Sequence, residues 1–498
     1  MRTDRQVHPE RGGKTPDAVR ATLTAGPFRR YLIGQLTSNT GTWMQRAAQD
    51  LLVLHLTGNS GGAVGVVTAL QFLPQTLFGL VGGILADRFP RRTLLLITQS
   101  TMAALSLLLG ILTITGSVTL AWVFALAFAL GTATAVDAPA RGAFIPELVG
   151  RTYVAAAVSL NSAQFNVARF IGPALAGLAV AAAGTGPVFL VNAASYLAVL
   201  YGLITLPTRA PRRSSGPRRG ATRPGAPFRH IAATPELLLP VTVIAVVGTF
   251  GLNFQVTLSV MAVEVFHSGP AAYGCLSAAY AAGSLVGALL TARRGRPPTA
   301  RLLVTATVVF GTLEATLGLM PGYAAFTAFL VPTGLAAATV TTTANTLTQL
   351  HTDPGLRGRV MSVYFLVLLG GTPVGAPLVG LVSDTFGARS SLVLGGLISA
   401  SSALALSALV HARQAGSGAG EASGSAAGPR TGAPGTAANR CCAFRRRVQR
   451  LREAPGGVLV PRYHRGVSVH ARVPRDPAEH GLSVTEEASP TPGAPGRK

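Results

Sequence analysis

Two charged residues, Arg46 and Asp50, interrupt the otherwise uncharged stretch 31–54. Their spacing of four places both side chains near one face of a helix, where they can pair. A charge among apolar side chains is costly unless it has a partner or faces water. One hypothesis is therefore a structural ion pair. The other is that Asp50 binds and releases a proton, with Arg46 moderating its proton affinity.

Three uncharged polar residues, Gln35, Asn39 and Thr42, extend this face with the helical spacings four, three and four up to Arg46. A second stripe of Ser162, Asn166 and Arg169 follows the same spacing. Both stripes are predicted to line a polar cavity. The partner of Arg169 is left open between a nearby carboxylate, an anionic substrate and a helix-to-helix contact.

Further candidates are isolated in apolar segments. Glu314 is a weaker candidate for proton coupling, and Asn253 and Asn345 are expected to line the same cavity from the second half of the chain. Phe72 and Tyr280 are candidates for substrate contact, although packing is the simpler explanation for an aromatic residue in an apolar helix.

The composition explains why these polar residues stand out. Of the 498 residues, 49% are hydrophobic and 12% are charged, and mean hydropathy is +0.43, whereas a soluble domain carries about 25% charged residues. The net charge of +24 comes from short basic clusters between apolar runs. This distribution indicates a membrane protein and argues against nucleic-acid binding.

Apolar runs of about 20 residues, the length that crosses a bilayer, occur twelve times. The expected spans are 30–56, 62–86, 93–115, 118–138, 155–183, 187–206, 236–264, 270–292, 300–320, 323–348, 357–383 and 390–410. The loops and N-terminal arm on one side carry twenty-five Lys and Arg residues, and those on the other side carry only Arg389. This asymmetry predicts that both termini are cytoplasmic. On this map Asp137 and Arg141 form a surface salt bridge at the end of the fourth span.

The spans divide into two sets. We expect an N-terminal arm (1–27), a six-helix half (28–206), a polar Arg- and Pro-rich linker (207–234), a second six-helix half (235–410) and a disordered tail (411–498). The sequence of residues 172–178 partly repeats at 375–381, an offset of 203 that also aligns Gly184 with Gly387. The expected fold is therefore an all-α membrane protein of twelve transmembrane helices in two pseudo-symmetric halves.

A short motif joins the second and third expected spans. It contains Gly83, Asp87, Arg88, Arg91 and Arg92. Its charge pattern resembles the loop G-x3-D-[RK]-x-G-x-[RK]-[RK] of the major facilitator superfamily, with Pro90 in place of the second Gly. The resemblance, which covers about residues 28–410, implies the major facilitator fold and a latch between the halves on the cytoplasmic side. Simple positive-inside charge is the alternative explanation.

A second motif lies in the fifth span, where Gly172 and Pro173 are followed by Gly177. It is similar to the G-P-x-x-G-G antiporter motif of the same superfamily, with Ala176 in place of the first paired Gly, and this implies export. An ordinary proline-kinked helix is the alternative. Residues 28–58 also resemble exporters of the enterobactin and macrolide efflux type found in actinobacteria.

These features predict a transporter and not an enzyme. The chain has no phosphate-binding loop, hydrolase triad or metal-ligand spacing, so no cofactor or metal is expected. The expected function is proton-coupled export of a drug-like, siderophore-like or secondary-metabolite molecule by a monomer in the plasma membrane. Its partners are a small-molecule substrate, protons and the lipid bilayer. A proton-coupled importer and a non-transporting membrane sensor are the alternatives.

Overall fold

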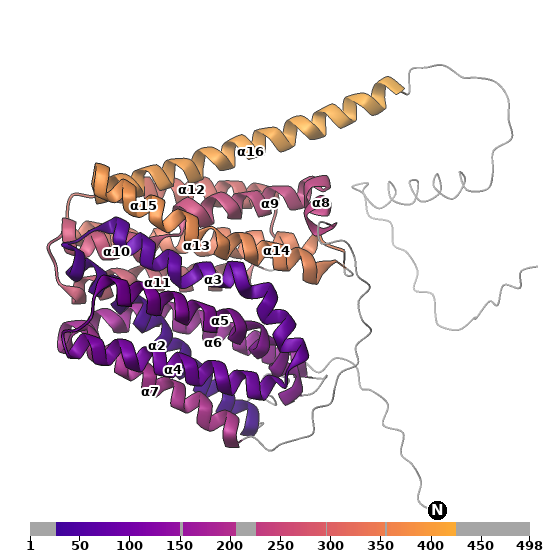
Figure 1. Cartoon of the computed structure of the whole chain (residues 1–498). Coiled ribbons are helices and arrows are strands. Elements are labelled where there is room, and N and C mark those ends of the chain that lie inside the picture. The colour runs from indigo at the N-terminus through magenta and orange to yellow at the C-terminus, as the bar shows by residue number, and fades with distance from the viewer. Residues whose placement is uncertain (1–25, 150–152, 206–225, 295, 354–355, 425–498) are drawn as a thin grey trace, which may run out of the picture. The chain divides into compact units, whose positions relative to one another are not determined.

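The computed structural model describes residues 26–149, 153–205, 226–294, 296–353 and 356–424. These residues form helices and no strand (Figure 1). The expected linker and tail therefore lie largely outside the described residues. The first six helices are α2 (Gly26–Thr57), α3 (Gly61–Arg88), α4 (Arg91–Ile114), α5 (Leu120–Val149), α6 (Val154–Ala183) and α7 (Thr185–Thr205).

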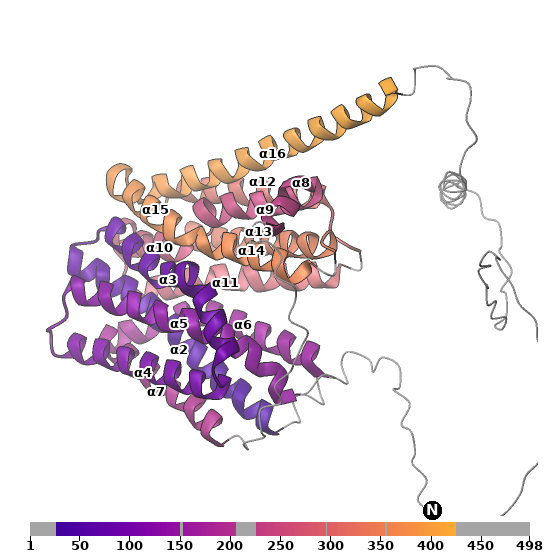
Figure 2. The ribbon, with the colours of Figure 1, turned by 45° about the vertical axis from the view of Figure 1, so that its right-hand side comes forward.

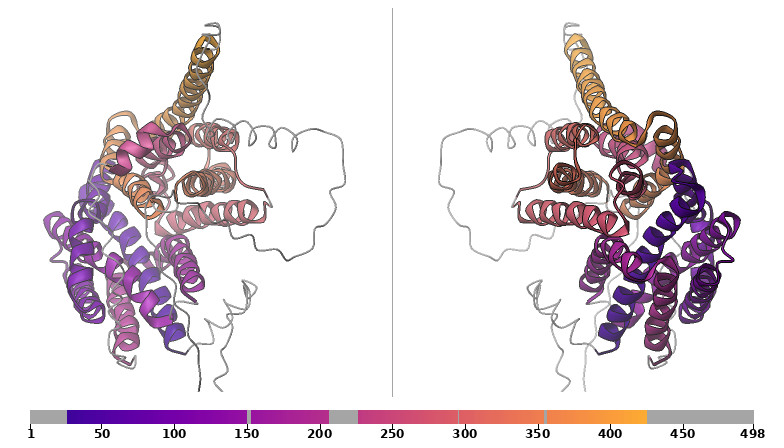
Figure 3. Two further views of the ribbon diagram at one scale, coloured as in Figure 1. Left: turned by 90° about the vertical axis from the view of Figure 1, so that its right-hand side faces the viewer. Right: turned by 90° about the vertical axis from the view of Figure 1, so that its left-hand side faces the viewer.

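The second group begins with the short helix α8 (Ala226–Ala233). It continues with α9 (Pro235–Val246), the π-helix η2 (Val247–Gly251), α10 (Phe254–Val260), the π-helix η3 (Met261–Val265), α11 (Pro270–Arg293), α12 (Ala300–Gly318), α13 (Tyr323–Leu350), α14 (Arg357–Gly370), α15 (Thr372–Phe386) and α16 (Ala388–Gly424). Figures 2 and 3 show α2–α7 as one group and α9–α16 as another.

Eleven segments of the described chain are long and apolar enough to cross a membrane. They confirm the expected all-helical, multi-span class. The segments Pro235–Val265 and Arg357–Phe386 each count as one span although their helices are interrupted. The remaining expected span is α2, which has 32 residues but is not among the eleven.

Helix α2 differs because polar side chains fill its buried face. Gln35, Asn39, Gln45 and Gln49 are each at most 7% exposed. Inside an apolar bundle such groups must bond to protein, and most of them do: for example, Asn192 of α7 donates to Gln45 at 2.6 Å. Hydrogen bonds therefore supplement apolar packing where α2 meets α3, α6 and α7.

The offset-203 repeat has a structural counterpart in α6 and α15. Both helices contain an internal proline, Pro173 and Pro377. Both end at a glycine with positive φ, 81° at Gly184 and 85° at Gly387, a conformation that favours glycine. Each helix also packs against the other group, α6 against α11 and α15 against α3.

The segment 235–265 is interrupted in its middle. The π-helix η2 ends at Gly251, and α10 starts again after Asn253. The Asn253 side chain donates to the Thr249 carbonyl oxygen at 2.6 Å. A Cβ added at Gly375 would lie 1.7 Å from that same oxygen, so α15 packs closely against the interruption. π-Helical turns inside helices occur frequently at functional sites.

Close helix contacts depend on glycine at particular positions, and Gly283 of α11 tests this. A Cβ there would lie 1.9 Å from the Val331 carbonyl oxygen of α13. We expect Gly283→Val to separate these helices and to cost about 1–3 kcal/mol or more, since overpacking a close backbone contact is destabilising. Thermal denaturation of the detergent-purified protein, followed by fluorescence-detected size exclusion, measures the loss.

Gly79→Val in α3 is the matched control, because no atom lies within 4 Å of its added Cβ. Equal melting temperatures for the two variants would contradict the α11–α13 packing.

Candidate functional site

Asp50 is wholly buried and bridges the two groups of helices. Gln255 of α10 donates to Asp50 Oδ2 at 2.7 Å, while Oδ1 has no hydrogen-bond partner among the described residues. A carboxylate buried with one neutral donor is costly, and binding a proton removes that cost.

The structure contains no ion pair between Arg46 and Asp50 in the part of the chain it describes. Instead, the Arg46 guanidinium carbon lies 4.5 Å from the ring centre of Phe72 and 4.8 Å from that of Trp43. Arg46 is only 5% exposed, and its Nε atom has no hydrogen-bond partner in the described chain. The predicted direct pairing along α2 is therefore absent, and cation–π contacts hold Arg46 in its place.

Arg169 of α6 approaches the same tryptophan. Its guanidinium carbon lies 5.6 Å from the Trp43 ring centre. Ser162, Asn166 and Arg169 are all exposed. Their helical spacing gives α6 a polar face that is not buried by neighbouring helices.

Glu314 of α12 is 3% exposed, and its Oε2 atom has no hydrogen-bond partner in the described residues. Its carboxyl group faces two glycines: an added Cβ would lie 3.0 Å from Oε2 at Gly251 and 3.1 Å from Oε1 at Gly395. Gly251 belongs to η2, so the interrupted segment 235–265 contacts Glu314 through Gly251 and Asp50 through Gln255.

The other candidate cavity residues do not gather at one place. Gln35, Asn39, Thr42 and Asn253 are 1%, 7%, 9% and 4% exposed. Asn39, Thr42 and Asn253 bond within their own groups of helices: Asn39 to Gln164, Thr42 to Tyr196 and Asn253 to Thr249. Asn345 is partly exposed and accepts from Gln349 at 2.5 Å.

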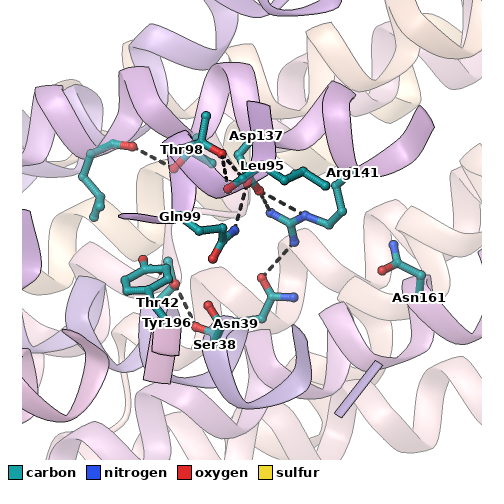
Figure 4. A network of polar contacts seen from close by, with 12 residues as sticks. Ser38, Asn39, Thr42, Leu95, Thr98, Gln99, Asp137, Arg141, Asn161 and Tyr196 are labelled. Carbon is teal, nitrogen blue, oxygen red and sulfur yellow. Dashed lines mark hydrogen bonds and ion pairs between the residues drawn. The ribbon is translucent and has the colours of Figure 1, made fainter. Parts of the chain in front are cut away.

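Asp137 is the centre of a buried network (Figure 4). Thr98 and Gln99 of α4 donate to Oδ1 at 2.9 and 2.8 Å, and Arg141 forms an ion pair with Oδ2. Arg141 also donates to Asn39 Oδ1 at 3.1 Å. Asp137 has no exposed surface, so the interpretation as a surface salt bridge is wrong. The reason is that α5 continues to Val149, beyond the expected end at 138.

The predicted latch motif lies at the end of the bundle that carries most of the arginines, here called the arginine-rich end. Arg91 pairs with Glu147, and Arg92 donates to the Ile204 carbonyl oxygen at 2.9 Å. Asp87 and Arg88 are exposed, and their side chains have no hydrogen bond or ion pair within the described chain. A Cβ at Gly83 would meet no atom within 4 Å.

The opposite, arginine-poor end joins the two groups of helices. Asp384 of α15 accepts from the backbone N–H groups of Gly61 and Gly62 at 2.6 and 2.9 Å and from the Ser60 hydroxyl at 2.8 Å. These donors lie at the N-terminus of α3, where a negative charge is favourable. A Cβ at Gly380 would lie 2.2 Å from the Gly61 carbonyl oxygen, so α3 and α15 are in direct contact.

The predicted antiporter motif makes the equivalent contact between α6 and α11. A Cβ at Gly177 would lie 2.4 Å from the Gly274 nitrogen, and one at Gly172 would lie 2.5 Å from Trp43 Cβ. Pro173 lies within α6 between these two contacts. The motif therefore packs α6 against both α2 and α11.

Sequence reasoning missed Gln255 and Asp384. Asp384 is the only acidic residue in the span Arg357–Phe386, and this isolated charge could have marked it as a candidate. Gln255 had no distinctive spacing. In the described chain, no group of three or more His, Cys, Asp or Glu residues could hold a metal ion.

The described chain has eleven apolar spans with buried charged residues between them, and its two groups of helices contact each other at one end. These features define an integral membrane carrier. A family model described as transmembrane secretion effector (MFS_3) matches residues 18–427. The chain belongs to this family, which confirms the resemblance to major facilitator transporters.

Relatives of this chain include transporters and efflux proteins. Macrolide efflux protein A of Streptococcus pyogenes is 23% identical over 70% of this chain and 88% of its own. The enterobactin exporter EntS of Citrobacter koseri is 25% identical over 74% and 85%. The staphyloferrin A transporter of Staphylococcus aureus is 30% identical, but over 32% of this chain and 41% of its own.

Among solved structures, a bacterial homologue of the human lysosomal transporter Spinster, in an inward-facing and unoccupied conformation, superposes with a TM-score of 0.65. It is 16% identical, and the match covers 78% of this chain and 97% of the other. This similarity shows the fold. The chain is thus a multi-span transporter with efflux-type relatives, and not an enzyme.

Replacement of Asp137 tests whether its network is structural. Asp137→Ala leaves the Arg141 guanidinium without its carboxylate in a buried position, which costs about 3–5 kcal/mol. The double variant Asp137→Ala/Arg141→Leu removes both charges, and we expect it to recover part of that stability. Chemical denaturation in a mild detergent measures the differences.

Arg91→Gln is the control because it breaks the partly exposed pair with Glu147, and such pairs contribute about 0–1 kcal/mol. An Asp137→Ala variant as stable as Arg91→Gln would refute the buried network.

Proposed function

We propose that this chain is a twelve-span exporter that exchanges a small molecule for protons across the plasma membrane. Helix α2, the first in the sequence, brings the number of spans to twelve. Residues 28–206 and 235–410 form the two six-helix halves, and the linker 207–234 joins them. Both termini are cytoplasmic, the protein acts as a monomer, and residues 1–27 form an arm. The expected tail 411–498 is shortened by α16, which continues to Gly424, and is disordered after that residue. The charge asymmetry of the loops supports this orientation.

The observation that carries this proposal is the contact between halves at the arginine-poor end. There Asp384 caps α3, and the glycines of α6 and α15 pack against the other half. At the arginine-rich end, Asp87 of the latch motif has no partner in the described chain. We infer that this conformation is closed to the outside, and that outward opening breaks the Asp384 contact and engages the Asp87 motif.

Proton coupling is assigned to the two buried carboxyl groups, Asp50 and Glu314. Both are buried, and each has one carboxyl oxygen without a hydrogen-bond partner in the described chain. Both also contact the interrupted segment, through Gln255 and Gly251. A movement of this segment therefore changes the surroundings of both groups at once, which links proton binding to conformational change.

The relatives support export of an antibiotic-like or siderophore-like compound, since they include a macrolide efflux protein and an enterobactin exporter. A proton-coupled importer is the second candidate, and a non-transporting sensor is the third. The contact of Gly177 with Gly274 in the antiporter-like motif favours a moving carrier over a sensor.

Asp50→Asn tests the coupling. We expect the variant to lose accumulation driven by a pH gradient by about tenfold or more, because an amide cannot carry the proton. It should retain substrate exchange at equal pH. The measurement uses proteoliposomes and a fluorescent dye that overexpressing cells extrude, with Glu314→Gln compared in parallel.

Glu236→Gln is the control, because Glu236 is exposed at the start of α9. If Asp50→Asn and Glu314→Gln both responded to the gradient like the wild type, these carboxyl groups would not be the coupling sites. Accumulation in the direction of import would favour the second candidate function.

Asp384→Ala tests the closed end. Loss of a capping carboxylate costs about 0.5–2 kcal/mol, which shifts the ratio of closed to open conformations by roughly twofold to thirtyfold towards opening. One spin label is placed on the loop after α2 and a second on the loop before α11, both at exposed positions in a cysteine-free background. The distance between the two labels, measured by electron–electron double resonance, reports this ratio.

Asp353→Asn at the arginine-rich end is the control, since Asp353 is exposed. An unchanged distance distribution in Asp384→Ala would show that this carboxylate does not hold the end closed.

A further inference from the structure

We propose that Arg46 and Arg169 form, around Trp43, the binding site for an organic anion that carries an aromatic ring. The acidic group of the substrate is a carboxylate, a catecholate or another oxyanion that guanidinium groups recognise. This inference rests on the proposed function and narrows its substrate class.

The first observation is that both guanidinium groups lack a partner. Among the described residues, neither Arg46 nor Arg169 has a hydrogen bond to an acceptor or an ion pair with a carboxylate. Arg141, by contrast, has Asp137 and Asn39. Arg46 is only 5% exposed, and a guanidinium group buried in this way normally has a carboxylate or phosphate partner. An oxyanion on the substrate would supply one here.

The second observation is that the two cations share one aromatic side chain. The guanidinium carbons of Arg46 and Arg169 lie 4.8 and 5.6 Å from the centre of the Trp43 ring. Phe72 packs beside Trp43, with ring centres 6.3 Å apart. Arg46 is 5% exposed and Arg169 is exposed. A ligand can therefore reach Arg169 first and contact Arg46 and the aromatic rings behind it.

The third observation is the position of the acidic groups. Asp50 accepts from Gln255, and the carboxyl group of Glu314 faces Gly251 and Gly395. Neither carboxyl group forms an ion pair with the two arginines in the described chain. A cationic ligand beside Trp43 would meet two like charges, whereas an anion would meet two opposite ones.

Tyr280 completes the site from the second group of helices. Its ring stacks on Phe254 of α10, with centres 4.4 Å apart and planes inclined by 27°, and its helix α11 packs against α6, the helix that carries Arg169. A ligand at Arg169 would thus contact both halves. Bound lipid is an unsuitable occupant, because Arg46 lies eleven residues before the end of α2, about 16 Å along the helix axis from that end.

Two dyes with the same xanthene ring system and opposite charge provide the test. The wild-type protein in zwitterionic lipid nanodiscs is titrated into 5-carboxyfluorescein, an anion, and into rhodamine 6G, a cation, with empty nanodiscs as blank. Fluorescence polarisation gives both dissociation constants. We expect 5-carboxyfluorescein to bind more tightly than rhodamine 6G, and 2-naphthoate to displace it better than the neutral 2-naphthamide.

Arg169→Gln and Arg46→Gln should each weaken 5-carboxyfluorescein binding by about tenfold or more, since each removes a charged contact. Rhodamine 6G binding should be unchanged or tighter, and this also shows that the variants are folded. Arg169→Lys, which keeps the charge without the planar fork, should give an intermediate value. Arg29→Gln, at an exposed position near the start of α2, is the matched control.

Wild-type affinity for 5-carboxyfluorescein in both Arg→Gln variants would overturn the proposal, as would failure of the wild type to bind this dye. Neither result would affect the pH-gradient experiment, which depends on the carboxyl groups. Conversely, arginine-dependent anion binding without any gradient-driven transport would refute the exporter and leave the anion site in place.

Discussion

A polar group buried in a membrane bundle must find its partner within the protein, and this constraint organises the molecule. Helix α2 presents Asn39, Gln45 and Gln49 to three different helices, and each receives or donates a hydrogen bond there. Asp137 takes four such bonds and neutralises Arg141. Hydrogen bonds of this kind fix the positions of the helices relative to one another.

The same constraint separates structural residues from the candidate site. Arg46 and Arg169 have no hydrogen-bond or ion-pair partner in the described chain, and Glu314 and Asp50 each have one carboxyl oxygen without a partner. These four groups are divided between α2, α6 and α12. The interrupted segment with Gly251 and Gln255 lies between the two carboxyl groups. Two buried carboxyl groups with an unpartnered oxygen thus lie beside a broken helix, as expected for a site that changes partners during transport.

The sequence was sufficient for the helices but not for the partners. Hydropathy predicted eleven membrane-length segments to within a few residues, except that α5 extends to Val149, and the helix that contains the last span continues to Gly424. The offset of 203 predicted the equivalence of Gly184 and Gly387, whose positive φ angles agree. Periodicity alone placed Arg46 beside Asp50, but whether they pair depends on Trp43, Phe72 and Gln255, which come from three helices. Contacts between distant segments, such as Asp384 with Gly61, have no signature in local spacing.

The charge of the substrate also determines the energetics of the proposed cycle. A cation exchanged for one proton moves no net charge, so the membrane potential does no work on that exchange. An anion that leaves while a proton enters moves the equivalent of two elementary charges. At about 2.3 kcal/mol per charge per 100 mV, an inside-negative potential contributes about 4.6 kcal/mol per 100 mV to each such exchange. A site formed by Arg46 and Arg169 would therefore let both the potential and the pH gradient drive export, and Asp50 would not need to neutralise the substrate. Its proximity to the interrupted segment leaves this carboxyl group available for proton exchange.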